Sequence, residues 1–473
     1  MKITLVNSNL MRPPVVPIAL DYIASALRAK GHSADLLDLC KADDWKKACD
    51  KYFSGSNPDA IGVTIRNTDD CFMAGSDFKL PAVKEITGYI KRKSGAPIIL
   101  GGCGFSVFPE RIMDFLDVNL GIVGEGESAL PLLLHVISRP SEYRKVPGLV
   151  RKIGGTYRRN PPVVLDLENT KLSDRSTVDN LWYFNNGGMG AVETKRGCVK
   201  SCIYCADRIS KGKQCRRRDP KDIADEFANL LKQGVTYIHI CDHEFNLPYG
   251  HAVMVCQELI DRNLGEKIRW YTYACPGHFD KSLAVLMKKA GCAGINFGID
   301  SGDPAMLRWL GKDHTVKDIA KTARLCRNNK IPFMFDLLIG GMGETKKSVK
   351  NTIDLMMRAG PDCVGVSMGI RVYPGTEIAD MVKTGLYSKK LKGRVKNNPG
   401  FFEPVFYLEE DFTEYILELI AGDNRFFFPQ KEKKSYNYSG NNTLIAAIKK
   451  GARGAFWDIL RRQQPMGHSE IEI

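Results

Sequence analysis

Three cysteines within eight residues have the spacing of a metal-binding loop. They are Cys198, Cys202 and Cys205, in the order Cys-x3-Cys-x2-Cys. Thiolate sulfur is a soft ligand that selects iron–sulfur clusters or zinc. Three cysteines would leave one iron of a four-iron cluster free to bind a reacting molecule, whereas a structural zinc site closes with a fourth ligand, for which Cys215 is available. The triad therefore indicates an open iron–sulfur cluster or a zinc knuckle.

The elements that must position this loop follow a β/α alternation. Strand patterns lie at residues 190–195, 237–241, 269–274, 294–300, 333–339 and 363–368, with helical patterns between several of them. Six such units predict a partial (β/α)6 barrel whose chemistry lies at the carboxyl ends of the strands.

A similar alternation occupies the first part of the chain. Strand patterns lie at residues 3–7, 34–39, 59–65, 97–100 and 118–124. They predict an α/β fold with a Rossmann-like, doubly wound parallel sheet, which binds its ligand at the strand carboxyl ends. We expect this domain at residues 1–140, a linker with a small hairpin at 141–185, the partial barrel at 186–385 and a small, mainly helical C-terminal cap at 386–473.

Length and composition limit the class of protein. A chain of 473 residues predicts two or three domains, and 44% hydrophobic with 26% charged residues is typical of a globular protein. No apolar run reaches the roughly 20 residues of a membrane helix, and no signal peptide is evident, so we expect a cytoplasmic protein without membrane association. Its 14 cysteines are then expected to be reduced thiols.

The net charge of +14 bears on partners. The basic residues are scattered, apart from clusters at 211–218 and 431–434, and no basic stretch is interleaved with aromatic residues. We therefore expect no nucleic-acid partner, and instead phosphate-bearing cofactors or an acidic protein.

Glycine-rich loops follow the predicted strands of the first domain. Glycine lets the backbone approach a large flat ligand closely. Together with the cysteine spacing and the aromatic Tyr204 before the third cysteine, these loops resemble cobalamin-dependent radical S-adenosylmethionine (SAM) enzymes. A plain nucleotide-binding or structural α/β domain is the alternative. The loop residues that the resemblance assigns to cobalamin are Arg66, Asn67, Gly101, Gly102, Phe105, Gly124, Glu125 and Glu127.

The resemblance also bears on which residue, if any, would ligate cobalt. Domains that ligate cobalt through histidine carry Asp-x-His-x-x-Gly, which is missing here, because His32 and His135 lie in other contexts. Cobalamin without a histidine ligand is therefore expected. Methyltransferases of this family with an Ile-Arg-Asn loop place an arginine beneath cobalt, which implies that role for Arg66. The alternative is a loop arginine that binds phosphate or caps a strand.

For the second domain the resemblance implies a [4Fe-4S] cluster on the three cysteines and a SAM site. Asp242 and Glu244 would contact the SAM amino group, Asp300 and Ser301 the ribose, Gly340 and Gly341 the adenosine, and Arg371 a carboxylate. Each has an ordinary structural alternative. Glu244 also admits a second role, as the carboxylate that occupies the free iron in enzymes of the tryptophan 2-C-methyltransferase type. Tyr273 and Tyr373 could also face the pocket, and with Glu244 they are the candidate catalytic residues.

The resemblance implies a C-methyltransferase that moves a methyl group from SAM through methylcobalamin to a carbon centre. A radical route is expected, because Asp242, Asp300, the 340–344 turn and Arg371 together resemble a complete SAM-cleaving site. The substrates ranked are a glutamine in methyl-coenzyme M reductase, then a free amino acid such as tryptophan, then a lipid or tetrapyrrole. Ferredoxin or flavodoxin is the expected electron donor. The alternatives are non-radical methylation, cyclisation or rearrangement, and a non-enzymatic metal-binding module.

Overall fold

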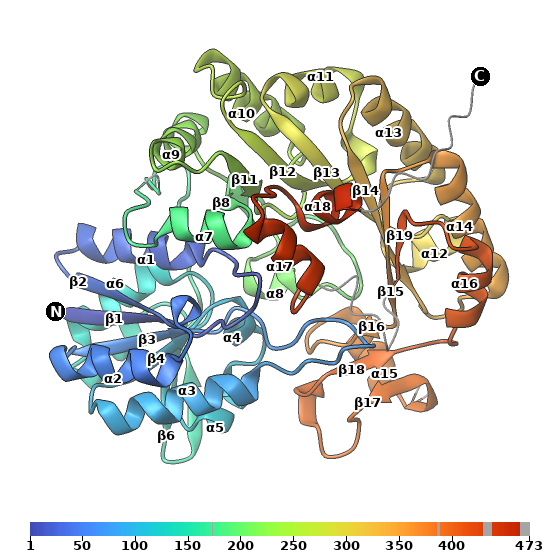
Figure 1. The fold of residues 1–473 in the computed structure, drawn as a ribbon. Coiled ribbons are helices and arrows are strands. Elements are labelled where there is room, and N and C mark those ends of the chain that lie inside the picture. Colours follow the sequence, from blue (N-terminus) through green and yellow to red (C-terminus); the bar gives the residue numbers. More distant parts are fainter. Residues whose placement is uncertain (173, 386–387, 429–437, 464–473) are drawn as a thin grey trace.

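Two seven-stranded sheets with helices packed around them make up most of the molecule (Figure 1). The computed structural model describes residues 1–172, 174–385, 388–428 and 438–463. The first sheet belongs to the N-terminal part of the chain and the second to the central part, as the two alternating patterns predict. The α/β fold class is confirmed.

The first sheet has the strand order β2-β1-β3-β4-β5-β6-β7. Its five parallel strands are β1 (Lys2–Asn7), β2 (Ser33–Asp38), β3 (Ala60–Thr64), β4 (Ile98–Gly101) and β5 (Leu120–Ile122). The hairpin predicted in the linker is β6 (Leu149–Ile153) with β7 (Thr156–Arg159), and it extends this sheet antiparallel to β5. The helices of this part are α1 (Ile18–Ala29), α2 (Trp45–Gly55), α3 (Leu80–Lys93), α4 (Cys103–Val107), α5 (Pro109–Leu116) and α6 (Gly126–Val136).

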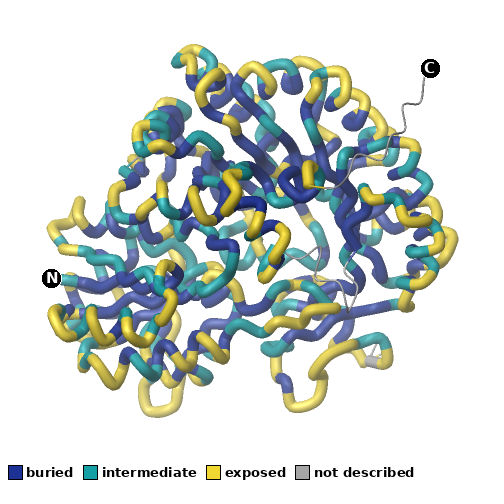
Figure 2. Tube along the Cα trace, viewed as in Figure 1, coloured by how far each residue is buried: buried dark blue, intermediate teal, exposed yellow. Residues whose placement is uncertain are grey.

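The second sheet is parallel throughout, in the order β19-β15-β14-β13-β12-β11-β8. Six of its strands are those predicted for the partial barrel: β8 (Gly190–Val192), β11 (Tyr237–Ile240), β12 (Arg269–Ala274), β13 (Cys292–Asp300), β14 (Phe333–Ile339) and β15 (Cys363–Met368). Its helices include α7 (Asn180–Gly187), α9 (Pro220–Lys232), α10 (Tyr249–Asp261), α11 (Lys281–Lys289), α12 (Pro304–Trp309), α13 (Val316–Asn328) and α14 (Lys346–Ala359). Figure 2 shows the strands of both sheets buried beneath more exposed helices.

The C-terminal region contributes strands as well as helices. A small sheet joins β16 (Ile370–Arg371), β17 (Leu391–Gly393) and β18 (Val405–Tyr407), and β19 (Phe426–Phe427) adds a seventh strand to the second sheet. The helices are α15 (Glu377–Lys383), α16 (Thr413–Ile420), α17 (Asn442–Lys449) and α18 (Phe456–Gln463). The basic cluster at 431–434 lies outside the described residues.

Helices α17 and α18 lie between the two sheets, and this segment contacts both (Figure 1). Tyr271 of β12 donates a hydrogen bond to Asp458 at 2.7 Å and packs edge-on against Trp457. Just before α17, the amide of Gly440 donates to the carbonyl of Arg12 in the first domain at 2.7 Å. The predicted cap therefore joins the two domains.

Buried ion pairs form a second connection, which we call the interdomain seam: Asp21, Tyr22, Arg175, Arg218 and Glu226. Arg175 bonds Asp21 of α1 and Glu226 of α9, both at 2.8 Å, and all three side chains are fully buried. A buried guanidinium is stable only when its donors are paired, so this arginine fixes α1 against α9. Within the described part of the chain, no helix is both long and apolar enough to cross a bilayer.

Candidate active site

The three cysteines lie close together on the loop that follows β9 (Lys195–Arg196). Burial raises the pKa of Cys205, and the charges of Asp207, Cys202 and Cys198 raise it further. Since these effects act over short distances, the three thiols share one site. Among the described residues, no three His, Cys, Asp or Glu side chains converge on a single-ion position. A donor set of three sulfurs, each partly accessible, fits a cluster that binds one sulfur per iron.

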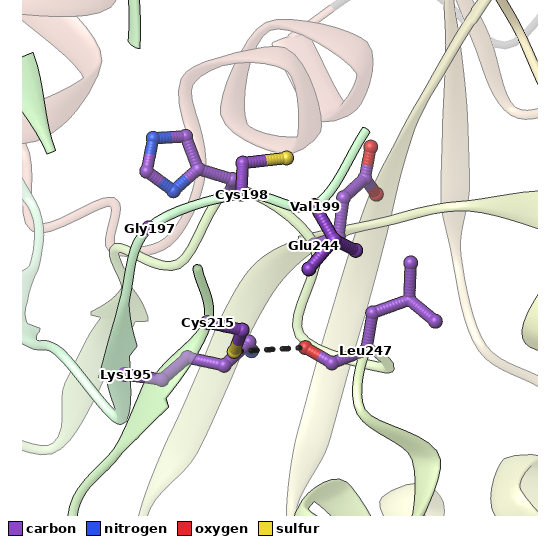
Figure 3. Close-up of a pocket in the computed structure, with 8 residues that line it drawn as sticks. Lys195, Gly197, Cys198, Val199, Cys215, Glu244 and Leu247 are labelled. Carbon is purple, nitrogen blue, oxygen red and sulfur yellow. Dashed lines mark hydrogen bonds between the residues drawn. The ribbon is translucent and has the colours of Figure 1, made fainter. Parts of the chain in front are cut away.

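Cys215, the possible fourth ligand of a zinc site, points away from Cys198. The Cys215 thiol lies 3.9 Å from the carbonyl oxygen of Leu247 and donates to it. In Figure 3 its sulfur lies below the loop, whereas the Cys198 sulfur extends on the other side, where the Glu244 carboxylate also lies. The structure thus separates Cys215 from the side on which a metal centre at Cys198 would form.

Two lysines place positive charge beside the thiols. Lys312 lies 2.9 Å from the Asp300 carboxylate and 4.0 Å from the Cys202 sulfur. Lys200 forms an ion pair with Asp313 and donates to the Cys275 sulfur at 3.3 Å. Burial raises the pKa of Cys202, and the charge of Lys312 opposes that rise. Nearby cations favour the thiolate form that binds metal.

Glu244 lies beside this group with an unused oxygen. Its Oε2 atom is buried and has no hydrogen-bond partner in the described part of the chain. Burial raises its pKa to about 7, against the opposing charges of Lys312 and Lys200. A buried carboxylate oxygen without a partner is costly, which points to a ligand that is absent here. The carboxylate is available to an ammonium or to a metal.

Asp242 lies only two residues before Glu244, but its carboxylate is hydrogen-bonded within the protein. Its carboxylate is fully buried and accepts from the Thr194 amide at 2.8 Å, from the Thr194 hydroxyl and from Lys195 at 2.7 Å. These bonds hold the end of β11 to the loop that carries the cysteines. Its oxygens are engaged within the protein.

The end of β13 holds the next two predicted residues. Asp300 has a left-handed backbone conformation, with φ of 63°, and its carboxylate pairs with Lys312 and accepts from the Tyr204 hydroxyl. Ser301 is buried and lies 3.1 Å from the hydroxyl of Thr352. Asp300 therefore belongs to the surroundings of the cysteine loop, while Ser301 bonds into α14.

The Gly340–Gly341 turn has its amides occupied. Both N–H groups donate to the Glu344 carboxylate, at 2.8 Å and 3.2 Å. A Cβ atom on Gly341 would lie 2.7 Å from the Trp309 ring, so glycine is required for close packing against α12.

Arg371 and Tyr373 meet Asp69 of the first domain. Arg371 lies 3.0 Å from Asp69 in a buried ion pair, and the Tyr373 hydroxyl donates to the same carboxylate at 3.1 Å. The Tyr373 hydroxyl also lies 3.0 Å from the Cys71 sulfur. These side chains therefore form a contact between the domains.

In the first domain, glycines support the loop that presents Arg66 and Asn67, both of which are exposed. The Gly104 amide donates to the carbonyls of Ile65 and Arg66, both at 3.0 Å, and a Cβ on Gly102 would lie 2.6 Å from the Ile65 oxygen. Arg66 makes no hydrogen bond or ion pair within the described residues. It is an available cation near β11 of the second domain: desolvation lowers the pKa of the half-buried His239 to about 4, and the charge of Arg66 contributes to that decrease.

The remaining loop residues of the first domain pack inward or pair. Phe105 is fully buried against Gly121. Gly124, just after β5, has φ of 83°, and the nearest atom to a Cβ built on Gly101 would be the Ile122 oxygen, at 4.0 Å. Glu127 bonds Arg196 at 2.6 Å, and Glu125 bonds Arg216 at 2.7 Å and Arg196 at 3.2 Å. Arg196 lies two residues before Cys198, so these two glutamates tie the first domain to the cysteine loop.

The second sheet encloses a polar interior that the sequence analysis largely missed. We call it the chamber: His239, Tyr273, Asn296, Gly298 and Asp336 on β11–β14. Along β13, a Cβ on Gly294 would meet Tyr271 and Trp457, whereas a Cβ on Gly298 would meet nothing within 4 Å in the described structure. Among the described residues, the cap therefore packs beside Gly294 and leaves space beside Gly298.

Tyr273 connects the chamber to the first domain. Its side chain is 39% exposed although its strand lies in the middle of the sheet. Burial and then the charge of Asp336 raise the pKa of Tyr273, while the charge of Arg66 opposes them, so both charged groups lie near Tyr273. The available signal was an asparagine at 296 and a glycine at 298, two residues apart in an otherwise apolar strand, with an aspartate at 336 in the next strand.

Comparisons with known proteins match both domains. Residues 11–134 match the B12 binding domain, and residues 192–356 match the radical SAM superfamily. The chain is 28% identical to tryptophan 2-C-methyltransferase of Streptomyces laurentii, over 96% of this chain and 95% of that protein.

Solved structures of the radical SAM methyltransferase TsrM of Kitasatospora setae are similar over almost the whole chain. The structure with tryptophan and a SAM analogue bound has a TM-score of 0.90 at 29% identity, covering 98% of this chain and 97% of that one. The structure with cobalamin and a [4Fe-4S] cluster bound has a TM-score of 0.87 at 28% identity, with the same coverage.

Proposed function

We propose that this chain, which is a cobalamin-dependent radical SAM methyltransferase, methylates a carbon atom of a small molecule held in the chamber. The observation that carries the proposal is the position of the chamber. Tyr273 lies near Arg66 of the B12-binding domain, and its carbonyl accepts from the amide of Phe245, next to Glu244, at 2.8 Å. A substrate in the chamber would thus lie between the two cofactor sites.

Residues of both domains would hold the cofactors. When bound, SAM, cobalamin and the [4Fe-4S] cluster supply the methyl group, its carrier and the electron-transfer chemistry. Cys198, Cys202 and Cys205 would ligate three irons of the cluster. Arg66 would lie beneath cobalt, where a cation disfavours a lower ligand. Glu125 and Glu127 are paired with Arg196, which lies just before the cysteine loop. Through these ion pairs they would fix the distance between the cobalamin site and the cluster site.

We assign Glu244 to the remaining iron. Of the carboxylates predicted for the SAM amino group, Asp242 is fully engaged by Thr194 and Lys195, whereas Glu244 keeps a buried oxygen without a partner. Arg371, predicted for a carboxylate, is paired with Asp69. Most of the residues whose combination predicted a SAM-cleaving site are therefore engaged in contacts within the protein. This supports the non-radical alternative, in which Glu244 keeps SAM from the iron and SAM acts only as a methyl donor.

The substrate class is the finer part of the proposal. The similar TsrM structure holds tryptophan, so tryptophan or a related small aromatic amine is the first candidate. A glutamine within a protein, ranked first from the sequence, is a weaker candidate because Trp457 and Tyr271 close one end of the interior. Ferredoxin or flavodoxin remains the proposed electron donor.

An anaerobic turnover assay tests the route. The reconstituted enzyme is incubated with SAM and tryptophan, and S-adenosylhomocysteine, 5′-deoxyadenosine and methylated product are quantified. We expect S-adenosylhomocysteine in stoichiometry with product and no 5′-deoxyadenosine. Glu244→Gln should open the iron and start abortive formation of 5′-deoxyadenosine, while Glu258→Gln, on the surface of α10, should not. Stoichiometric 5′-deoxyadenosine from the unmodified enzyme would contradict the assignment of Glu244.

A further inference from the structure

We infer that Asn296 and Asp336 form a subsite for the amino nitrogen of the substrate, bound as an ammonium. This inference rests on the proposed function, because it specifies what the chamber would hold. Asn296 lies on β13 and Asp336 on the neighbouring β14. The Asn296 amide nitrogen donates to the Asp336 carboxylate at 2.8 Å.

The orientation of the Asn296 amide follows from this bond. Only the nitrogen of an asparagine amide can donate to an ionised carboxylate, so its oxygen must face the other way. That oxygen is buried and accepts no hydrogen bond within the described residues, and the side chain is only 5% exposed. A buried amide oxygen without a donor costs about 1–3 kcal/mol, so the site is built to receive a donor.

Space for that donor lies on the same face of β13. Gly298 is two residues from Asn296, so both face the same side of the sheet, and Gly298 pairs with Asp336 in the strand register. A Cβ at Gly298 would contact nothing within 4 Å in the described part of the chain. Glycine therefore leaves room directly beside the two acceptors.

The charge of the subsite selects the ligand. Asn296 contributes an acceptor oxygen beside the Asp336 carboxylate, and together they favour a substrate ammonium and disfavour a substrate carboxylate. Tyr273 lies near both Asp336 and Arg66, so a small aromatic molecule anchored here by its nitrogen would extend toward the B12-binding domain. Anchoring one end determines which carbon is presented for methylation.

Polar groups just beyond the end of β13 clarify the assignment. Ser301 and Thr352 lie 3.1 Å apart, and Ser301 also accepts from the Asp303 amide at 3.1 Å. Those groups are satisfied within the protein and carry no ligand. Asn296 differs from these groups because its amide oxygen still lacks a donor after its amide nitrogen has bonded Asp336.

The experiment measures binding of two matched pairs to the holoenzyme by calorimetry. The pairs are tryptamine with 3-ethylindole, and L-tryptophan with indole-3-propionate, and the members of each differ by one amino group. We expect the amines to bind about 10- to 100-fold more tightly than their partners, the range of a hydrogen bond to a charged group. Asn296→Leu and Asp336→Asn should each remove most of that preference. Asn329→Leu, at the end of α13 outside the chamber, should keep it.

Three outcomes would overturn the inference. The first is equal binding of both members of each pair, and the second is an amine preference that Asn296→Leu leaves unchanged. The third is absence of binding by either amine to the unmodified holoenzyme. Because binding is measured without turnover, loss of methyl transfer alone contradicts the proposed function and leaves the subsite standing. Conversely, equal binding of amine and amine-free indoles by an active methyltransferase rejects only the subsite.

Discussion

The interdomain seam and the chamber region both bury polar side chains, but they differ in how their acceptor oxygens are used. In the seam both oxygens of Asp21 and of Glu226 accept hydrogen bonds, and only a donor, Arg218 Nε, lacks a partner among the described residues. In the seam, Arg175 directs its three nitrogens to Asp21, Glu226, Asn180 and the carbonyl of Ala191. Near the chamber, Glu244 and Asn296 each keep a buried oxygen without a partner in the described structure. Satisfied buried groups fix domains in place, whereas unsatisfied ones have a cost that a ligand can remove.

The contrast separates residues of the same type. Asp242 and Glu244 follow the same strand, yet the first is engaged by three donors and the second is not. Two arginines predicted for cofactors differ in the same way, because Arg371 is paired with Asp69 and Arg66 has no partner among the described residues. Burial alone therefore does not identify a functional residue.

The largest expected effect is in the seam. Arg175→Met should lower the free energy of unfolding by about 3–5 kcal/mol, because it leaves Asp21 and Glu226 buried without their shared cation. Urea denaturation of the apoprotein measures this. Arg28→Met is the matched control, since its pair with Asp174 is partly exposed, and should change stability by less than about 1 kcal/mol. Equal effects of the two variants would show that the seam does not hold the domains.

The same contrast explains how far the sequence alone could lead. The cysteine triad and the strand–helix alternation are local patterns, and they predicted the cluster loop, both sheets and the two domain types. The ion-pair partners of Arg371 and Glu127 could not be predicted from the neighbouring sequence. Asp69 is 302 residues from Arg371, and Arg196 is 69 residues from Glu127. A charged residue at a strand end has the same appearance in a sequence whether it binds a cofactor or a distant side chain.

Chamber residues were missed for a different reason. Asn296 and Gly298 lie in a strand that otherwise reads as buried, and the pattern does not show which side of the sheet remains open. That depends on Trp457, more than 150 residues later, which fills the space beside Gly294 and stops short of Gly298. The position of the cap decides where the chamber lies.

A second prediction concerns acid. His251 is 1% exposed, its Nε2 lies 3.1 Å from the Thr194 carbonyl, and burial lowers its pKa to about 4. Between pH 6.5 and 4 the unfolded chain binds a proton at this residue that the folded chain does not, so stability falls as the pH falls through that window. The expected loss is about 2–3 kcal/mol.

Urea denaturation at pH 7 and pH 4.5 measures this loss. His251→Gln should reduce the difference between the two conditions, whereas His135→Gln, on the partly exposed end of α6, should not. An unchanged difference in His251→Gln would indicate that the folded protein already carries the proton. The prediction sharpens the comparison, because His251 is buried and pairs only through Nε2, while its Nδ1 has no partner among the described residues.

The smallest expected effect distinguishes the open chamber from the packed turn at Gly341. Gly298 has an extended backbone and open space at its Cβ position, so Gly298→Ala should leave stability unchanged or raise it by roughly 0.4–1 kcal/mol, through the lower entropy of the unfolded chain. Gly341→Ala should instead destabilise by about 1–3 kcal/mol, because its Cβ would lie 2.7 Å from the Trp309 ring. Thermal unfolding of the two variants tests this difference. Gly298→Ala should also weaken tryptamine binding to the holoenzyme, since the added methyl group enters the space beside Asn296 and Asp336. A destabilised Gly298→Ala protein would show that the space is filled in solution, and the chamber would then be no more open than the turn.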